Sequence, residues 1–434
     1  MRTYLDLYVQ VVYNNFTFYE IYSREDSDFV KSKKEGEKNM FTINTGLTYL
    51  AVLLFIAGGL LVLQRTTKWK IFDIVPPLVW IYVLNMILCT MGIFESDAVK
   101  ATYSGFKNNL LYALIFVMLL RCDFRKLAKL GPRMIAIFLG GSLTLAIGTI
   151  IGFPLFANTL GGAEKSWAAV AALYASWVGG SANMAAMEAA FTIDPGAYGA
   201  ALALDTVCYS VWIALLLLAV KIAPKWNKIC NADTSKLDEV AKVANAQLGE
   251  KKAATAADWI FIIGLSLIVS AISQKAGTII NNGLCAIGLD MFGAATCTTV
   301  FVTVLGLVCA MTPIGKLAAV EELSSVYLYA VVSLLASRAS LVDLVAAPMW
   351  IVYGMFILLV HVVTYFILSK VFKWDLCMVS TASLANIGGS ASAPIVATAY
   401  DPNFAGIGVL MGVLGAAIGN FCGLGMGAIL QLFV

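Results

Sequence analysis

Charged side chains are scarce in this 434-residue chain: they make up 13% of it, whereas hydrophobic residues make up 60%. Soluble domains carry about 25% charged residues, so this chain has too few polar side chains to cover a surface in water. Its apolar residues come in runs of about 20, the length at which a helix crosses a hydrocarbon core of roughly 30 Å. Because lipid does not tolerate open sheet edges, the composition predicts an all-α integral membrane protein.

Histidine, paired cysteines and nucleotide-binding motifs are also missing. A single histidine excludes a His-rich metal site, and the nine cysteines include no Cys-x-x-Cys pair. Most of the cysteines lie inside apolar runs, where cysteine is a small packing residue. Neither GxxxxGK[ST] nor HExxH occurs, which argues against ATP hydrolysis by this chain and against a zinc protease. We therefore expect no metal site, no cofactor and no enzymatic activity.

The chain divides into four parts. Residues 1–39 are polar, aromatic and mixed in charge. We expect them to be an extension ahead of a native start at Met40, with a disordered tail as the alternative, and we assign no function to them. A first membrane repeat is predicted at 40–222, a cytoplasmic linker at 223–257 and a second membrane repeat at 258–434.

Two short apolar segments, 165–192 and 376–399, are interrupted by the same glycine motif. The motif Gly179-Gly180-Ser181-Ala182 recurs as Gly388-Gly389-Ser390-Ala391, and each copy precedes an Asp-Pro pair, Asp194-Pro195 and Asp401-Pro402. A shared motif with the same neighbours at a similar spacing indicates an internal repeat. The uninterrupted membrane crossings are expected at 45–64, 72–93, 108–120, 132–156, 197–222, 258–274, 294–314, 324–337, 348–372 and 404–431.

The distribution of Lys and Arg predicts the topology. Cytoplasmic loops are rich in these residues, and here they gather at 65–70, 121–133 and 221–252. All three can face the cytoplasm only if the segment 165–192 enters and leaves on one side as a re-entrant hairpin. Each half then has five crossings and one hairpin, and because five is odd the second half is inverted. The alternative has twelve crossings, with both broken segments spanning as unwound helices.

The broken segments are expected to carry the chemistry. A helix break exposes N–H groups that suit an anion and carbonyl groups that suit a cation, and glycine lets a ligand approach the backbone. The predicted substrate- and ion-binding residues are Gly179, Gly180, Ser181, Asn183, Asp205, Asn386, Gly388, Gly389, Ser390 and Ser392. The alternative is that these small residues serve only close helix packing. We favour that packing role for the stripe Gly415, Gly419, Gly423 and Gly427 of the last span.

Ionisable residues inside the spans give a second signal. Asp205 lies within the run 197–222, where a carboxylate costs about 2.5–3.5 kcal/mol on insertion scales. We predict a proton or Na⁺ site or a substrate anchor there, with a structural hydrogen bond to a broken backbone as the alternative. His361 and Glu188 are candidate proton relays; a packing histidine and an interfacial glutamate are the alternatives. Asp194 and Asp401 precede prolines and are expected to cap helices.

Several of these strings resemble a known family. They are Asn386-Ile387-Gly388-Gly389-Ser390-Ala391-Ser392-Ala393-Pro394, Val178-Gly179-Gly180-Ser181, Ala203-Leu204-Asp205-Thr206 and Leu359-Val360-His361. Over about residues 42–432 the chain resembles the YjcL-like family, bacterial membrane proteins described only as a domain of unknown function. That family often has Asn after the aspartate, where this chain has Thr206. More distantly, the paired glycine segments are similar to the hairpins of sodium-coupled citrate and glutamate carriers.

The resemblance implies a multi-pass protein of the bacterial cytoplasmic (inner) membrane with transporter-like character. We predict a secondary transporter of a small solute, coupled to Na⁺ or H⁺, with its site between the two breaks. A channel or a non-transporting membrane component is the alternative, and an intramembrane enzyme is less favoured. The expected partners are the lipid bilayer and a small-molecule solute, not nucleic acid, and a homodimer is left open.

Overall fold

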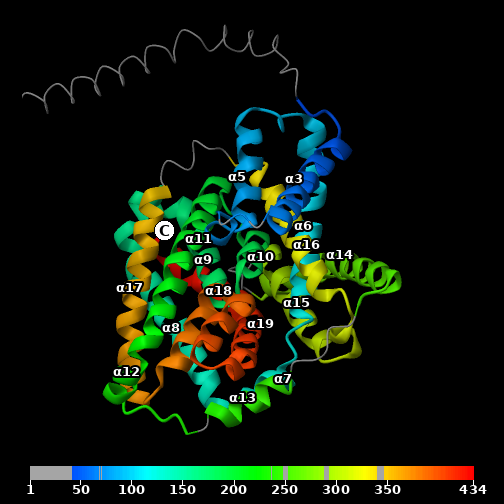
Figure 1. The fold of residues 1–434 in the computed structure, drawn as a ribbon. Helices are drawn as coiled ribbons and strands as arrows, with labels where there is room; N and C mark the ends of the chain where they lie inside the picture. Colours follow the sequence, from blue (N-terminus) through cyan, green and yellow to red (C-terminus); the bar gives the residue numbers. More distant parts are fainter. Residues whose placement is uncertain are drawn as a thin grey trace, which may run out of the picture.

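A computed structural model describes residues 42–434 except 68, 70, 236, 248–252, 288–292 and 340–346. The predicted extension 1–39 lies outside these residues. All the regular structure that is described is helical, with no strand in these ranges (Figure 1). Six stretches are long and apolar enough to cross a bilayer: Gly46–Thr67, Phe124–Leu160, Pro195–Cys230, Ala256–Ala286, Pro348–Phe372 and Pro402–Phe433. The chain is therefore an all-helical, multi-span membrane protein, as its composition predicts.

Six helices form what we term the frame bundle. They are α3 (Gly46–Thr67), α5 (Pro77–Thr90), α6 (Asp97–Leu119), α14 (Ala256–Ala286), α15 (Ala294–Ala310) and α16 (Val320–Ala336). Helix α6 packs against α14, α15 and α16, whereas α16 packs against α3, α5 and α6. The frame bundle thus interleaves helices from both halves of the sequence.

Seven helices form a second group, the hairpin bundle, which holds both glycine motifs. They are α8 (Gly131–Phe156), α9 (Ala163–Gly179), α10 (Ser181–Phe191), α11 (Pro195–Ala219), α17 (Ala347–Phe372), α18 (Leu376–Tyr400) and α19 (Ala405–Leu430). Helix α8 packs on α17, and α9 packs on both α18 and α19. The short helices α4 (Ile71–Ile74), α7 (Phe124–Leu127), α12 (Ala223–Cys230) and α13 (Leu237–Asn245) lie in the connections.

Two helices are longer than their apolar runs predict. Helix α6 begins at Asp97 rather than near 108, and α14 continues to Ala286 rather than ending near 274. The extra turns carry polar side chains, such as Lys107 of α6, which forms an ion pair with Glu188 of α10 at 3.1 Å. Hydropathy misses these turns because charged and amide side chains, such as Lys107, Lys275 and Asn281, interrupt their apolar residues.

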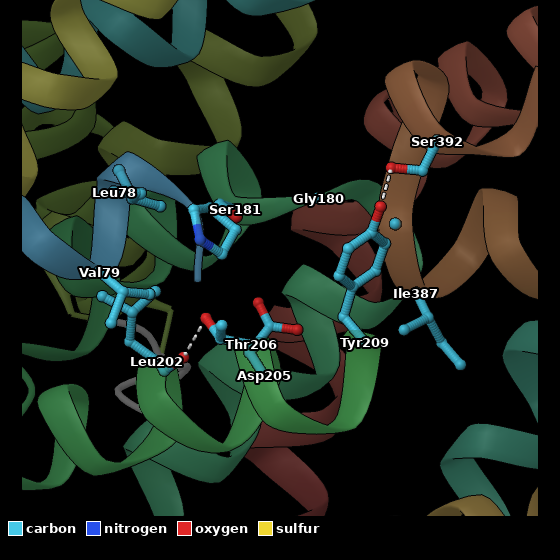
Figure 2. A pocket seen from close by; sticks show the side chains of 12 residues that line it. Leu78, Val79, Gly180, Ser181, Leu202, Asp205, Thr206, Tyr209, Ile387 and Ser392 are labelled. Carbon is cyan, nitrogen blue, oxygen red and sulfur yellow. Dashed lines mark hydrogen bonds between the residues drawn. The ribbon is translucent and has the colours of Figure 1, made fainter. Parts of the chain in front are cut away.

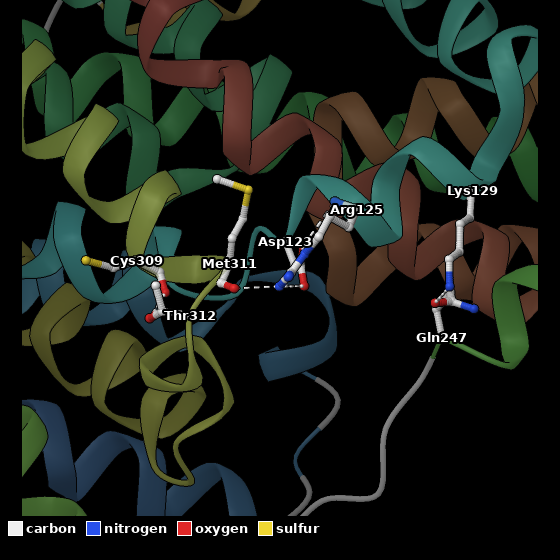
Figure 3. Close-up of polar contacts among 7 residues, drawn as sticks. All are labelled: Asp123, Arg125, Lys129, Gln247, Cys309, Met311 and Thr312. Atoms are coloured by element: carbon white, nitrogen blue, oxygen red, sulfur yellow. Dashed lines mark hydrogen bonds and ion pairs between the residues drawn. The ribbon is translucent and has the colours of Figure 1, made fainter.

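Two of the three basic segments, the loop 121–133 and the described part of the linker, come together at one end of the molecule, with α7, α12 and α13 (Figure 1). In the loop 121–133, Lys129 Nζ donates to Gln247 Oε1 of the linker at 3.0 Å, and Arg125 Nη2 donates to the carbonyl of Met311 at 2.6 Å (Figure 3). Arg125 also donates two hydrogen bonds to the carboxylate of Asp123, at 2.9 and 3.0 Å. These bonds hold the pKa of that carboxyl below its usual value. We call this the basic end.

Candidate binding site at two helix breaks

The helical path is interrupted at the second glycine of each motif. Gly180 separates α9 from α10 with φ 94° and ψ 171°, and Gly389 interrupts α18 with φ 69° and ψ −164°. Both φ values lie in the region that strains residues with a Cβ, so the sequence needs glycine at these two points. A Cβ placed on Gly389 would lie 3.9 Å from the Cα of Gly180. The two interruptions therefore lie against each other, although they are far apart in the sequence.

The two ends of each interrupted segment also meet. The rings of Trp167 and Phe191, near the start of α9 and the end of α10, have centroids 5.1 Å apart. In α18, the hydroxyls of Ser380 and Tyr400 are 3.1 Å apart. A continuous helix would separate these pairs by roughly 36 and 30 Å. Each segment therefore folds back on itself at its glycine.

Helix α19 packs across both interruptions through its small residues. A Cβ on Gly412 would overlap the backbone of Ser390, and one on Gly415 would overlap the carbonyl of Val178. A Cβ on Gly419 would come within 3.1 Å of the Gly179 Cα. The stripe in this helix serves close packing, as predicted.

Asp205, on α11, holds the end of α9 in place. Its side chain accepts two hydrogen bonds, from Ser176 Oγ at 2.9 Å and from Trp177 Nε1 at 2.7 Å. These donors lie immediately before the Gly180 break. The carboxylate is thus bonded to side chains of a broken segment, not to its open backbone as the alternative supposed, and it also borders a cavity.

That cavity, which we call the Asp205 cavity, has a volume of about 210 Å³ and lies beside both glycine motifs (Figure 2). Its polar lining is Gly180, Ser181, Asp205, Thr206, Tyr209, Gly388 and Ser392, and apolar residues from the start of α5 close one side. Tyr209 Oη donates to Ser392 Oγ at 2.9 Å, across the cavity from α11 to α18. Five predicted site residues meet here: Gly180, Ser181, Asp205, Gly388 and Ser392.

A second cavity, the Ser390 cavity, lies on the other side of the Gly389 break and has a volume of about 740 Å³. Ser390 and Ala391 line it together with residues of α19. Its opposite wall comes from the basic end, including Arg121 and Lys126. The predicted site residue Ser390 therefore faces a different cavity from the other five.

Asn183 and Asn386 border neither cavity. Asn183 Nδ2 donates to Asn420 Oδ1 at 2.9 Å and to the carbonyl of Ala416 at 3.2 Å. Asn386 Nδ2 donates to the carbonyl of Ala382 at 2.8 Å, and its Oδ1 accepts from Ser142 Oγ at 2.6 Å. Their hydrogen bonds join helices beside the breaks. Gly179 also borders neither cavity and packs against α19.

The two candidate proton relays lie apart from the Asp205 cavity. His361 is fully buried, with Nδ1 2.6 Å from Thr144 Oγ1 and Nε2 2.8 Å from Ser383 Oγ. Glu188 is also buried, accepts from the Ile193 amide at 2.7 Å, and forms an ion pair with Lys107 of α6 at 3.1 Å. These contacts match the two alternatives, a packing histidine and a glutamate at an interface.

The predicted helix caps are confirmed. Asp194 Oδ1 accepts from the amide of Ala197 at 2.9 Å, and Asp401 Oδ1 accepts from the amide of Asn403 at 2.8 Å.

Tyr209 is a lining residue that the sequence analysis did not identify. It follows Asp205 by one helical turn, so the two side chains share a face of α11, and this spacing was the signal available. Ser176 and Trp177 were also missed. They bond Asp205 from another element, so no local pattern reveals them.

Comparison with known proteins gives one relationship. A search of curated proteins finds no match. The sequence profile described as "Protein of unknown function (DUF819)" matches residues 51–433. The match spans both glycine motifs, Asp205 and nearly all of both bundles. The chain belongs to the DUF819 family.

Proposed function

We propose that this protein is a secondary transporter of a small solute, coupled to Na⁺ or H⁺, whose site is the Asp205 cavity. The observation that carries the proposal is the contact between Gly180 and Gly389 beside a buried carboxylate. Irregular backbone at membrane depth is tolerated where protein or a water-filled cavity satisfies it. Secondary transporters place such discontinuous helices at their substrate and ion sites.

We infer that both interrupted segments are re-entrant hairpins that enter from opposite faces. Arg133 Nη1 bonds Asp233 Oδ2 at 2.9 Å, which puts the start of α8 and the linker at the basic end. The carbonyl of Lys373, just before α18, accepts from Arg133 at 3.0 Å, and the carbonyl of Asn403, just after it, accepts from Asn245 of α13 at 2.8 Å. Helix α18 thus starts and ends at the basic end, whereas α9 and α10 follow the far end of α8.

This arrangement supports ten crossings in two inverted halves over the twelve-crossing alternative. The packing is reciprocal: α6 contacts α14 and α15, the first two helices of the second half, and α16 contacts α3 and α5, the first two of the first half. Helices α8 and α17, which precede the two hairpins, also pack on each other. Such exchange of partners is what a two-fold axis in the membrane plane produces.

The two cavities stand at corresponding positions of the two repeats. Ser181 and Ser390 occupy the same place in their motifs, and Leu202 and Val409, which line the two cavities, each lie seven residues after the proline of their Asp-Pro pair. We infer that each cavity belongs to an access route from one face of the membrane. The Ser390 cavity, at the basic end, is the cytoplasmic one.

A channel is the second candidate, and the packing argues against it. Helix α19 fills the space beside both breaks so closely that Gly412 and Gly415 admit no side chain. A continuous pore between the two cavities would have to open these contacts. Movement of the hairpin bundle against the frame bundle exposes the site to each face in turn without such a pore.

Uptake into proteoliposomes tests the proposal. Purified protein is screened against a panel of labelled metabolites with imposed Na⁺ and pH gradients, beside protein-free liposomes. We expect at least one compound to accumulate with one gradient and not with the other. Equal fluxes in protein-containing and protein-free vesicles across the panel would contradict the assignment. The location, a bacterial cytoplasmic membrane, is part of the same proposal.

A further inference from the structure

The Asp205 cavity has one charged wall. Asp205 is the only ionisable acid among the described residues that line it, and no Lys, Arg or His is among them. The other polar groups are neutral hydroxyls, including those of Thr206 and Tyr209, and the rest of the lining is backbone and apolar side chains. The electrostatic character of the cavity is therefore set by one carboxylate.

This carboxylate has hydrogen-bond donors but no counter-ion. Ser176 and Trp177, which bond it, are both neutral, and Asp205 forms no salt bridge within the described parts of the chain. Glu188 provides the internal comparison, since it is equally buried and pairs with Lys107 at 3.1 Å. Buried charges are normally paired, and only Asp205 of these two opens onto a cavity.

We propose that the solute bound in this cavity carries a protonated amine, which supplies the missing counter-ion of Asp205. The inference rests on the proposed function and names the substrate class of that site. An ammonium group has three donors and no acceptor. In this cavity it would meet the carboxylate of Asp205 and the hydroxyl oxygens of the lining residues. Tyr209 adds an aromatic ring, and rings of this kind attract cations. An anionic solute would instead meet the Asp205 charge with no cation to offset it.

The size of the cavity limits the amine. A volume of about 210 Å³ is many times the roughly 10–15 Å³ that one water needs on the same measure, and it lies below the range of about 300 Å³ upward typical of drug-sized ligands. The cavity thus suits a compact organic amine of a few carbon atoms better than a bare metal ion or a large cation.

Three probes of equal size test the charge: n-butylamine, butyrate and butyramide. Each is titrated onto the purified full-length protein at pH 7 and constant ionic strength, and the thermal unfolding midpoint is followed by tryptophan fluorescence. Only n-butylamine should raise the midpoint saturably, by about 2 °C or more. A saturable rise with butyrate, or no rise with n-butylamine, would overturn the inference. The inference would also be overturned if NaCl, but not KCl, raised the unfolding midpoint and abolished the further rise with n-butylamine. That result would show that Na⁺ is the counter-ion of Asp205.

A matched pair of variants locates the effect. Thr206→Lys places an internal ammonium beside Asp205 and should abolish the response to n-butylamine, whereas Asp194→Asn, which removes an acid at the start of the same helix and outside the cavity, should retain it. Equal responses in both variants would show that the amine binds elsewhere. Transport is scored separately: if liposomes accumulate an anion in an Asp205-dependent way, the proposed function stands and the amine inference fails. If n-butylamine binds but no compound is transported, the amine inference stands and the proposed function fails.

Discussion

A single carboxylate, Asp205, performs two tasks at the residue scale. It accepts hydrogen bonds from Ser176 and Trp177, which hold the α9 end of the first hairpin, and it lines the cavity where the two breaks meet. An intramembrane acid of this kind is costly and rarely idle. The hydrogen bonds that Asp205 accepts are compatible with the ligand-binding role proposed for it, because its carboxylate also lines the cavity.

Replacing Asp205 with Asn should remove the dependence of uptake on the coupling ion and lower the initial rate at least about 10-fold, since the charge that binds the ion or solute is gone. The control is Asp194→Asn at the start of the same helix. That change weakens only a cap, worth about 1 kcal/mol, and should leave ion-dependent uptake in place. Undiminished coupling in the Asp205 variant would exclude Asp205 from the site.

The Lys107–Glu188 pair is a buried charge contact between the two bundles. Glu188→Gln leaves Lys107 without its counter-charge, which for a buried pair costs about 3–5 kcal/mol. We expect a clear fall in the thermal midpoint. The double change Lys107→Met with Glu188→Met should recover most of it, because no unpaired charge remains. A double variant as unstable as the single one would show that the pair does not act as a unit.

At the scale of elements, the closely packed glycines of α19, Gly412 among them, support both hairpins. Gly412→Ala forces a Cβ into the backbone of Ser390 and should destabilise the protein by about 1–3 kcal/mol. Gly425→Ala, in the same helix, meets nothing within 4 Å, and should be neutral or slightly stabilising, since Ala is the better helix former. Thermal unfolding of the two variants checks the contrast, and equal effects would argue against packing at Gly412.

The elements also show how far the sequence can be interpreted. The positions of the glycine interruptions were predictable, because a repeated motif marks them and glycine best tolerates φ 94° with ψ 171° and φ 69° with ψ −164°. The first turns of α6 were not, because they carry the charged Lys107, whose partner Glu188 lies on another helix. Asn183 and Asn386 were predicted to bind the substrate or ion because they lie beside the glycine motifs. Their hydrogen bonds to residues far away in the sequence, which no local pattern reveals, instead join neighbouring helices.

The topology is a property of the whole molecule and can be tested by labelling. In a variant whose nine native cysteines are replaced, Ser235→Cys in the linker should react with a membrane-impermeant thiol reagent only from the cytoplasmic side. Glu95→Cys, between α5 and α6, should react only from the other side, because α6 separates it from the basic end. Labelling of both from one side would contradict the ten-crossing arrangement.

The central claim is that the whole molecule moves a solute against its gradient by using the site between the two breaks. Concentrative uptake in proteoliposomes, with the membrane potential clamped at zero by K⁺ and valinomycin, tests it most directly, because a channel then only equilibrates the solute, even a cationic one, and a coupled carrier accumulates it. We predict that the wild-type protein accumulates its solute above the external concentration under a Na⁺ or proton gradient, and that Asp205→Asn does not. Wild-type flux that stops at equal concentrations, or accumulation unchanged in the variant, would contradict the account.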